Sequence, residues 1–111
     1  MAEKEKYLGE FEHILLLALI RLGKEAYGAK VRQLLKEVIE REVSIGAMYS
    51  TLERLEQKGL IESSLGESTP ERGGRAKRYF EVNATGKAAL KRTRSAIDTM
   101  WQDVNICGTG L

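Results

Sequence analysis

The chain has 111 residues, a length that predicts a single domain with a modest core. Hydrophobic residues make up 42% and charged residues 31%, as in soluble globular proteins, and the formal net charge of +2 means that a nucleic-acid function must depend on where the cations lie. The longest apolar run, residues 14–20, is far shorter than the roughly 20 residues of a membrane-spanning helix, and acidic residues precede it. We therefore expect a cytoplasmic protein that does not bind membranes.

The sequence also disfavours an enzyme. It has one cysteine, Cys107, and one histidine, His13, so a disulfide or a His/Cys metal site cannot form within one chain. It contains no nucleophile elbow, phosphate-binding loop or metal-ligand cluster. We predict no catalytic activity, no cofactor and no metal, and catalysis stays an alternative for which the sequence supplies no residues.

Two helices are predicted in the first third of the chain. Residues 8–22 repeat apolar side chains at intervals of three and four, beginning with Leu8 and Phe11, and the stripe is so wide that this helix should be central. Gly23 should end it. Residues 27–39 form a second, amphipathic helix, which opens at Tyr27 and carries Lys30 on its charged face.

A third helix is predicted from Ser44, whose hydroxyl can accept a hydrogen bond from a free amide of the first turn, to just before Gly59. Its predicted inward stripe is Ile45, Met48, Leu52 and Leu55, and its outward residues are Ala47, Tyr49, Ser50, Glu53, Arg54 and Gln57. Three such helices are compatible with a helix-turn-helix, and equally with other small bundles.

The helices are followed by a predicted antiparallel hairpin, with strands at residues 60–65 and 77–82. The stretch of residues 67–80, which spans the connection and the start of the second strand, contains Pro70, two adjacent glycines (Gly73 and Gly74) and four cations: Arg72, Arg75, Lys77 and Arg78. Glycines let a backbone approach phosphates closely while the cations reach along a groove. The alternative is a solvated loop of mixed charge, because acidic residues lie nearby.

A last helix is predicted to begin at a Thr85 cap. Its apolar positions, Leu90, Thr93, Ile97, Met100 and Val104, alternate steps of three and four, as in a short heptad seam. Little chain remains after this seam to cover it, so we predict a homodimer. Trp101 lies beside the seam, either packed in it or forming a platform for a flat ligand.

Five segments together carry a resemblance to a known family: LGEFE (8–12), AYG (26–28), SIGAMYSTLERLEQKGLI (44–61), GGRAKRYF (73–80) and TG (85–86). In this order they resemble the PadR family of bacterial winged-helix transcriptional regulators, over about residues 8–90. The resemblance implies a mainly α fold with a small β-hairpin, namely a winged helix-turn-helix. Residues 1–84 would form the DNA-binding domain, with the recognition helix at 44–58 and the wing at 67–78, and residues 85–111 a C-terminal dimerisation helix and tail.

The resemblance further implies a sequence-specific DNA-binding regulator, most often a repressor, that binds a roughly palindromic operator in double-stranded DNA as a homodimer. Some members are released by a small molecule, so we expect any effector to be flat, largely apolar and bound beside Trp101. The alternative function is a winged-helix module that contacts only proteins. The family's recognition-helix tyrosine falls on Tyr49, and Ser50 stands where the family usually has proline.

These implications give two sets of site residues. The predicted DNA-contacting residues are Tyr27, Lys30, Ser44, Ala47, Tyr49, Ser50, Thr51, Arg54, Arg72, Gly73, Gly74, Arg75 and Lys77. The predicted dimerisation residues are Leu8, Phe11, Leu90, Ile97, Met100, Trp101 and Val104.

Overall fold

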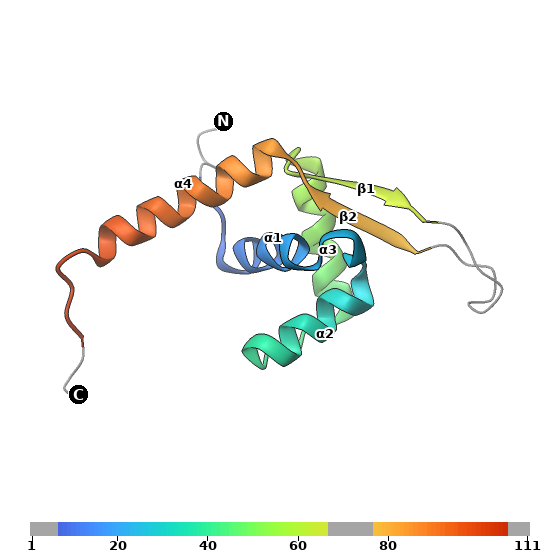
Figure 1. Ribbon diagram of the computed structural model, residues 1–111, viewed down its shortest axis with the longest axis horizontal. Coiled ribbons are helices and arrows are strands. Elements are labelled where there is room, and N and C mark those ends of the chain that lie inside the picture. The colour runs from blue at the N-terminus through green and yellow to red at the C-terminus, as the bar shows by residue number, and fades with distance from the viewer. Residues whose placement is uncertain (1–6, 67–76, 107–111) are drawn as a thin grey trace.

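A computed structural model describes residues 7–66 and 77–106 and has the predicted winged-helix arrangement (Figure 1). The elements in chain order are α1 (Glu10–Leu22), the 3-10 turn η2 (Gly23–Glu25), α2 (Gly28–Ile39), α3 (Ile45–Gln57), β1 (Ile61–Leu65), β2 (Arg78–Val82) and α4 (Ala84–Trp101). The fold is thus mainly helical with one two-stranded sheet, as the sequence predicted.

Helix α1 is the centre of the core. Leu15 and Leu16 are fully buried, and the helix packs against α2, α3, α4 and β2. The wide apolar stripe of its sequence therefore has a partner on several sides, as predicted. The buried apolar residues from the other segments are Ala26, Val31, Leu35, Met48, Leu52, Leu55, Leu60, Ile61, Phe80, Val82, Ala89 and Leu90.

The helix ends follow the predicted signals with two corrections. Ser44 caps α3, since its Oγ accepts a hydrogen bond from the Ala47 N–H at 3.1 Å, and Gly23 and Gly59 have positive φ after α1 and α3. The cap of α4, however, is Asn83 and not Thr85.

Asn83 Oδ1 accepts a hydrogen bond from the Gly86 N–H at 2.9 Å, and its Nδ2 donates to the Gly59 carbonyl at 3.0 Å. It therefore fastens the start of α4 to the end of α3. The second correction concerns Ile45, predicted to face inward but 56% exposed. It is the first residue of α3, one turn ahead of Met48, where the buried stripe begins.

The hairpin is fastened to the helices through β2. Ile61 pairs with Val82 and Leu65 with Arg78 in an antiparallel register, and the other edge of β2 meets the segment before α2, where the Phe80 N–H donates to the Ala26 carbonyl at 2.9 Å. An isolated two-stranded hairpin is only marginally stable in water, and the hydrogen bond at the second edge of β2 attaches this one to the helices. The predicted tip residues Arg72, Gly73, Gly74 and Arg75 lie outside the described residues.

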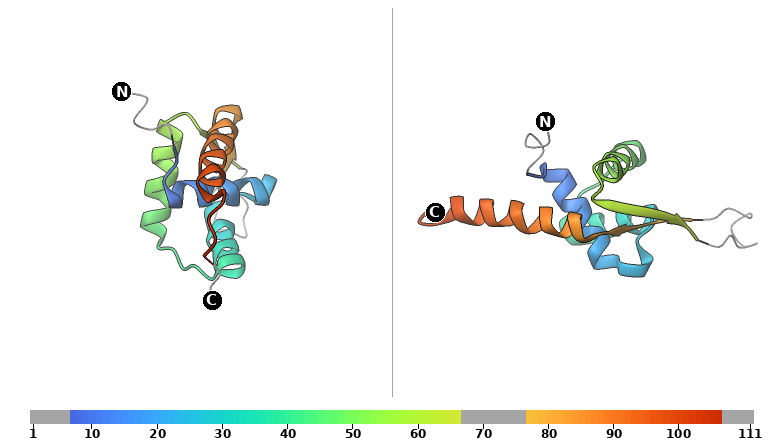
Figure 2. Two further views of the ribbon diagram at one scale, coloured as in Figure 1. Left: turned by 90° about the vertical axis from the view of Figure 1, so that its left-hand side faces the viewer. Right: turned by 90° about the horizontal axis from the view of Figure 1, so that it is seen from above.

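Helix α4 begins in the core and ends as an arm that leaves the body of the molecule (Figures 1 and 2). Leu90 is 7% exposed and Thr93 4%, whereas Ile97 is 51% and Met100 75% exposed. Leu90, predicted to lie in the dimer seam, is therefore covered by its own chain. No helix in the described segments is long and apolar enough to cross a membrane.

Candidate nucleic-acid interface

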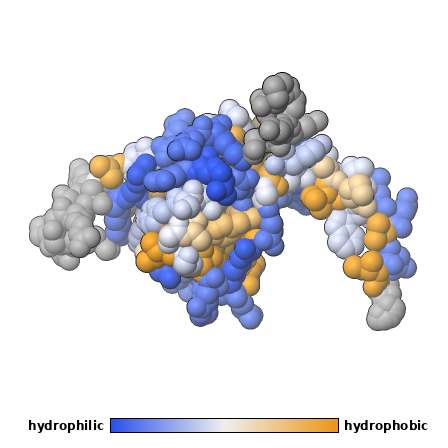
Figure 3. Space-filling view, turned by 180° about the vertical axis from the view of Figure 1, so that it is seen from behind, coloured by the Kyte–Doolittle hydropathy of each residue, from blue (hydrophilic) through white to orange (hydrophobic). Residues whose placement is uncertain are grey.

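The outward face of α3 presents a short polar stripe. Ala47, Ser50 and Arg54 follow each other at steps of three and four and are all exposed, while the opposite side of the helix is fixed in the core by Met48 and Leu52. Figure 3 views the molecule from the side on which α3 lies and shows mostly hydrophilic side chains over the upper body. A rigid helix with an exposed polar stripe is the element that helix-turn-helix proteins place in a major groove.

Tyr49 links α3 to the start of α2 and to the wing. Its ring centroid lies 6.4 Å from that of Phe80, and its hydroxyl lies over Gly28, where an added Cβ would come within 2.3 Å of that oxygen. The side chain is still 37% exposed. Tyr49 thus lies at the junction of the three elements, with part of its surface available to a ligand.

Tyr27 and Lys77 meet at the base of the wing. Tyr27 precedes α2 and stacks edge-on against Tyr79 of β2, with ring centroids 5.4 Å apart. The Lys77 ammonium lies 3.8 Å from the centroid of the Tyr27 ring, a cation–π contact. These contacts set the point at which β2 leaves the body, and they bring two predicted site residues together.

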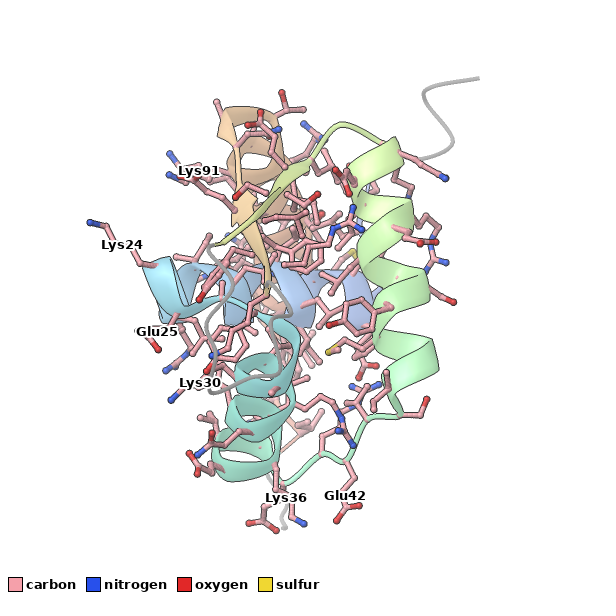
Figure 4. The ribbon with its side chains drawn as sticks, turned by 90° about the vertical axis from the view of Figure 1, so that its right-hand side faces the viewer. Lys24, Glu25, Lys30, Lys36, Glu42 and Lys91 are labelled. Atoms are coloured by element: carbon pink, nitrogen blue, oxygen red, sulfur yellow. The ribbon has the colours of Figure 1, made fainter. Side chains whose placement is uncertain are left out.

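Two other predicted DNA-contacting residues, Thr51 and Lys30, do not belong to the exposed stripe of α3. Thr51 is 5% exposed, and its hydroxyl donates to the Ala47 carbonyl at 2.9 Å, so its side chain is not available to DNA. The helical pattern had left Thr51 off the outward face, and its assignment to DNA came only from the family resemblance. Lys30 extends from α2 on the side away from α3 (Figure 4), so the structure does not bring it to the α3 stripe.

A polar cluster holds the last turns of α3 against the hairpin. The Glu56 carboxylate accepts hydrogen bonds from Ser63 Oγ at 2.9 Å and from Arg78 at 3.2 Å. Arg78 also donates to Ser63 Oγ at 3.0 Å. Side-chain hydrogen bonds therefore hold α3 against the hairpin, in addition to the core.

The sequence reading missed a buried carboxylate behind the α3 stripe. Glu12, only 7% exposed, accepts hydrogen bonds from Lys58 Nζ at 2.8 Å, Arg54 Nε at 3.3 Å and the Gly9 N–H at 2.9 Å. Burial works to raise the pKa of Glu12, but these hydrogen bonds outweigh it, so the pKa lies below its ordinary value. A sequence signal did exist, because a glutamate three residues after a cap position is typical of a capping box.

The exposed donors of α3 and of the hairpin are of kinds that bind nucleic acid. Arg54, Lys77 and the hydroxyls of Ser50 and Tyr49 can donate to phosphates or to base edges. In the described segments, no three His, Cys, Asp or Glu side chains are grouped so as to hold a metal ion.

Comparison with known proteins also indicates a transcriptional regulator. The sequence profile described as "Transcriptional regulator PadR-like family" matches residues 16–92. A PadR-like transcription factor from Bacteroides fragilis is 26% identical, with a TM-score of 0.69 over 89% of this chain and 88% of that one. A PadR family transcription regulator from Clostridium difficile R20291 is also 26% identical, with a TM-score of 0.59 over 82% and 94% of the two chains.

A transcriptional regulator from Clostridium thermocellum shares the fold, with a TM-score of 0.67 at 21% identity over 82% of this chain and 85% of that one. The search of curated proteins gave no match.

Proposed function

The chain belongs to the PadR-like family of transcriptional regulators, and from this premise we propose that it represses transcription by binding a roughly palindromic operator as a homodimer. The observation that carries the proposal is the exposed stripe of Ala47, Ser50 and Arg54 on α3, which is backed by the core. The stripe offers a hydroxyl and a guanidinium to base edges.

In this proposal α3 enters the major groove and the hairpin holds the DNA backbone. Arg54 and Ser50 supply base contacts, of which arginine to guanine is the commonest specific kind. Lys77 at the base of the wing supplies phosphate contacts, together with Arg72 and Arg75, which the sequence predicts in the wing tip. Such contacts position the protein without reading sequence.

The homodimer would form through the arm of α4. Ile97, Met100, Trp101 and Val104 are each at least half exposed in the single chain, and their pairing with a second copy would remove them from water. Leu8 and Phe11 pack at the edge of the core next to this region. A two-fold dimer presents two copies of α3, so its operator should be a pair of inverted half-sites about one helical turn apart.

An effector, where one exists, would bind beside Trp101. The indole is 53% exposed on the arm and can stack against a flat apolar molecule between the two copies of α4. Because Trp101 is the only tryptophan of the chain, its fluorescence reports such binding directly. If a compound that releases the protein from DNA binds Trp101→Ala equally well, the effector site lies elsewhere.

The proposal can be tested on DNA that the protein selects itself. Fragments of its own genome retained by the protein should share an inverted repeat, and binding should weaken as salt is raised, because phosphate contacts release counterions. A reporter gene whose promoter overlaps the selected site should be expressed less when the protein is present. Unchanged or higher expression would contradict repression, and a dimer with no DNA affinity at low salt would favour the protein-contact alternative.

A further inference from the structure

We propose that Glu12 is a positioning residue for operator discrimination, which acts by holding the Arg54 guanidinium in place on the α3 stripe. The inference rests on the proposed function, because it assigns Arg54 to base contact. It gives a role to Glu12 in the segment LGEFE, in which only Leu8 and Phe11 had been assigned a role, in dimerisation.

The carboxylate of Glu12 is anchored independently of α3. Its Oε1 accepts the Gly9 N–H at 2.9 Å, within the first turn of α1, and its Oε2 accepts both cations of α3, Lys58 at 2.8 Å and Arg54 at 3.3 Å. The residue before Gly9 is also held, because the Leu8 N–H donates to Thr93 Oγ1 of α4 at 3.0 Å. Arg54 therefore bonds to a fixed point of the core.

The contact with Glu12 leaves the other guanidinium donors of Arg54 available for DNA. Within the described segments, the hydrogen bond of Arg54 to Glu12 uses Nε alone, whereas the bidentate contact of arginine with guanine uses the other guanidinium donors. The Arg54 side chain is 52% exposed and that of Glu12 only 8%. One end of the pair thus lies in the protein and the other reaches the surface that faces DNA.

Holding Arg54 in this way should favour the correct sequence over others. A long, free arginine can find phosphates on any duplex, whereas an arginine held in one orientation loses less conformational freedom when it meets a matching base. The negative charge of Glu12 also offsets two nearby cations, which weakens sequence-independent attraction to phosphates. Its loss should therefore lower specific binding without lowering non-specific binding.

The test compares Glu12→Gln with Glu10→Gln on two duplexes, the site selected by the wild-type protein and a scrambled version of it. Glu10 is the matched control, because it lies in the same turn of α1, loses the same charge, and pairs with Arg41 at the surface, where its side chain is 77% exposed. For Glu12→Gln we expect the ratio of selected-site to scrambled affinity to fall about five- to tenfold, part of what one bidentate base contact provides. The ratio for Glu10→Gln should stay within about twofold of wild type.

A second comparison establishes that Glu12 acts through Arg54. In the background Arg54→Gln, which already lacks the guanidinium, Glu12→Gln should not lower the ratio further, because coupled residues are not additive. An equal further loss would overturn the proposal.

The remaining outcomes are also decisive. An unchanged ratio in Glu12→Gln would overturn the proposal, whether the two affinities stay as in wild type or fall equally, and an equal fall is what a merely structural role gives. Circular dichroism establishes folding, and if Glu12→Gln is unfolded then Glu12→Asp, which keeps the charge but withdraws the carboxylate by one methylene, decides by the same ratio. A wild-type protein that binds neither duplex at low salt would instead overturn the proposed function itself.

Discussion

At two glycines of this domain, neighbouring segments lie so close that an added Cβ would collide with them. A Cβ on Gly28 would lie 2.3 Å from the Tyr49 hydroxyl, and one on Gly86 would lie 2.3 Å from the Leu60 carbonyl oxygen and 2.7 Å from Val82 Cγ1. The hydroxyl is the end of a side chain that can rotate away, whereas the Leu60 carbonyl belongs to the backbone. The two positions therefore differ in what a methyl group would disturb.

We predict that Gly86→Ala lowers the free energy of unfolding by about 1 to 3 kcal/mol, the usual cost of overpacking a fitted contact. The matched control is Gly46→Ala, also in the first turn of a helix but with no atom within 4 Å of the added Cβ. Its stability should rise or stay within about 1 kcal/mol of wild type. Urea unfolding at one protein concentration measures both, and equal effects of the two substitutions would contradict the packing argument.

Glu12 gives a prediction about pH. Because its pKa is lower in the folded protein than its ordinary value of 4.5, its ionised form stabilises the fold above that pH, and this stabilisation is lost as the pH falls through the folded pKa. At neutral pH, Glu12→Gln should be less stable than wild type by about 1.5 to 3 kcal/mol, the range for hydrogen bonds to a charged group.

The difference between Glu12→Gln and wild type should then shrink as the pH falls below 4.5 and through the lowered pKa of Glu12, where the wild-type carboxylate is protonated. Urea unfolding of both proteins at several pH values measures it, with Glu10→Gln as the exposed control. A difference that stays constant or grows on acidification would mean that the charge of Glu12 does not stabilise the fold.

At the scale of elements, side-chain hydrogen bonds connect α3 to the hairpin. The Glu56 carboxylate bonds Ser63 and Arg78, so we predict that Glu56→Ala loosens the hairpin relative to the core. Exposed ion-pair networks contribute up to about 1 kcal/mol. Amides of β1 and β2 should therefore exchange with deuterium up to about fivefold faster, while those of α1 keep their wild-type rates.

Glu53→Ala is the control for this experiment, because Glu53 is exposed on the same helix one turn earlier. Its effect on exchange in the hairpin should be small. Faster exchange throughout the chain in Glu56→Ala would indicate a general loss of stability and would contradict a local effect of Glu56 on the hairpin.

Most helix boundaries, but not all of them, could be predicted from the sequence. The Ser44 cap, the buried positions of α3 from Met48 onward and the glycines after α1 and α3 follow from local rules, and the structure has them. Asn83 was missed because Thr85, two residues later, is also a cap by residue type. In the structure Asn83 is distinguished by the hydrogen bond that it accepts from the Gly86 N–H and by the one that it donates to the Gly59 carbonyl.

Glu12 could not be placed from helical periodicity, which treats an acidic residue as exposed. Its partners Arg54 and Lys58 are 42 and 46 residues away in the chain, so their meeting is a property of the tertiary fold. The exposure of Ile45 depends in the same way on where the core ends and not on the pattern of the helix itself.

At the scale of the whole molecule, α4 is divided between two environments. Its first half contributes Ala89 and Leu90 to the core, while its last turns carry apolar side chains on an arm that nothing in the described chain covers (Figure 3). Fully burying a large apolar side chain contributes about 1.5 to 3 kcal/mol. A second copy placed by two-fold symmetry would bury the same residues on both arms at once.

We therefore predict that Ile97→Asp converts a homodimer into a monomer, because symmetry would place two carboxylates in the apolar interface without partners. Ile45→Asp is the matched control, since Ile45 is the same residue type with a similar exposure, 56% against 51%, but lies at the start of α3 and away from the arm. Light scattering at micromolar concentration should give a dimer for wild type and for Ile45→Asp, and a monomer for Ile97→Asp. The fluorescence of Trp101 should shift to longer wavelength only in Ile97→Asp, as its indole becomes more exposed to water. A wild-type monomer at this concentration, or a dimer that survives Ile97→Asp with its fluorescence unchanged, would mean that the arm of α4 is not the dimer interface.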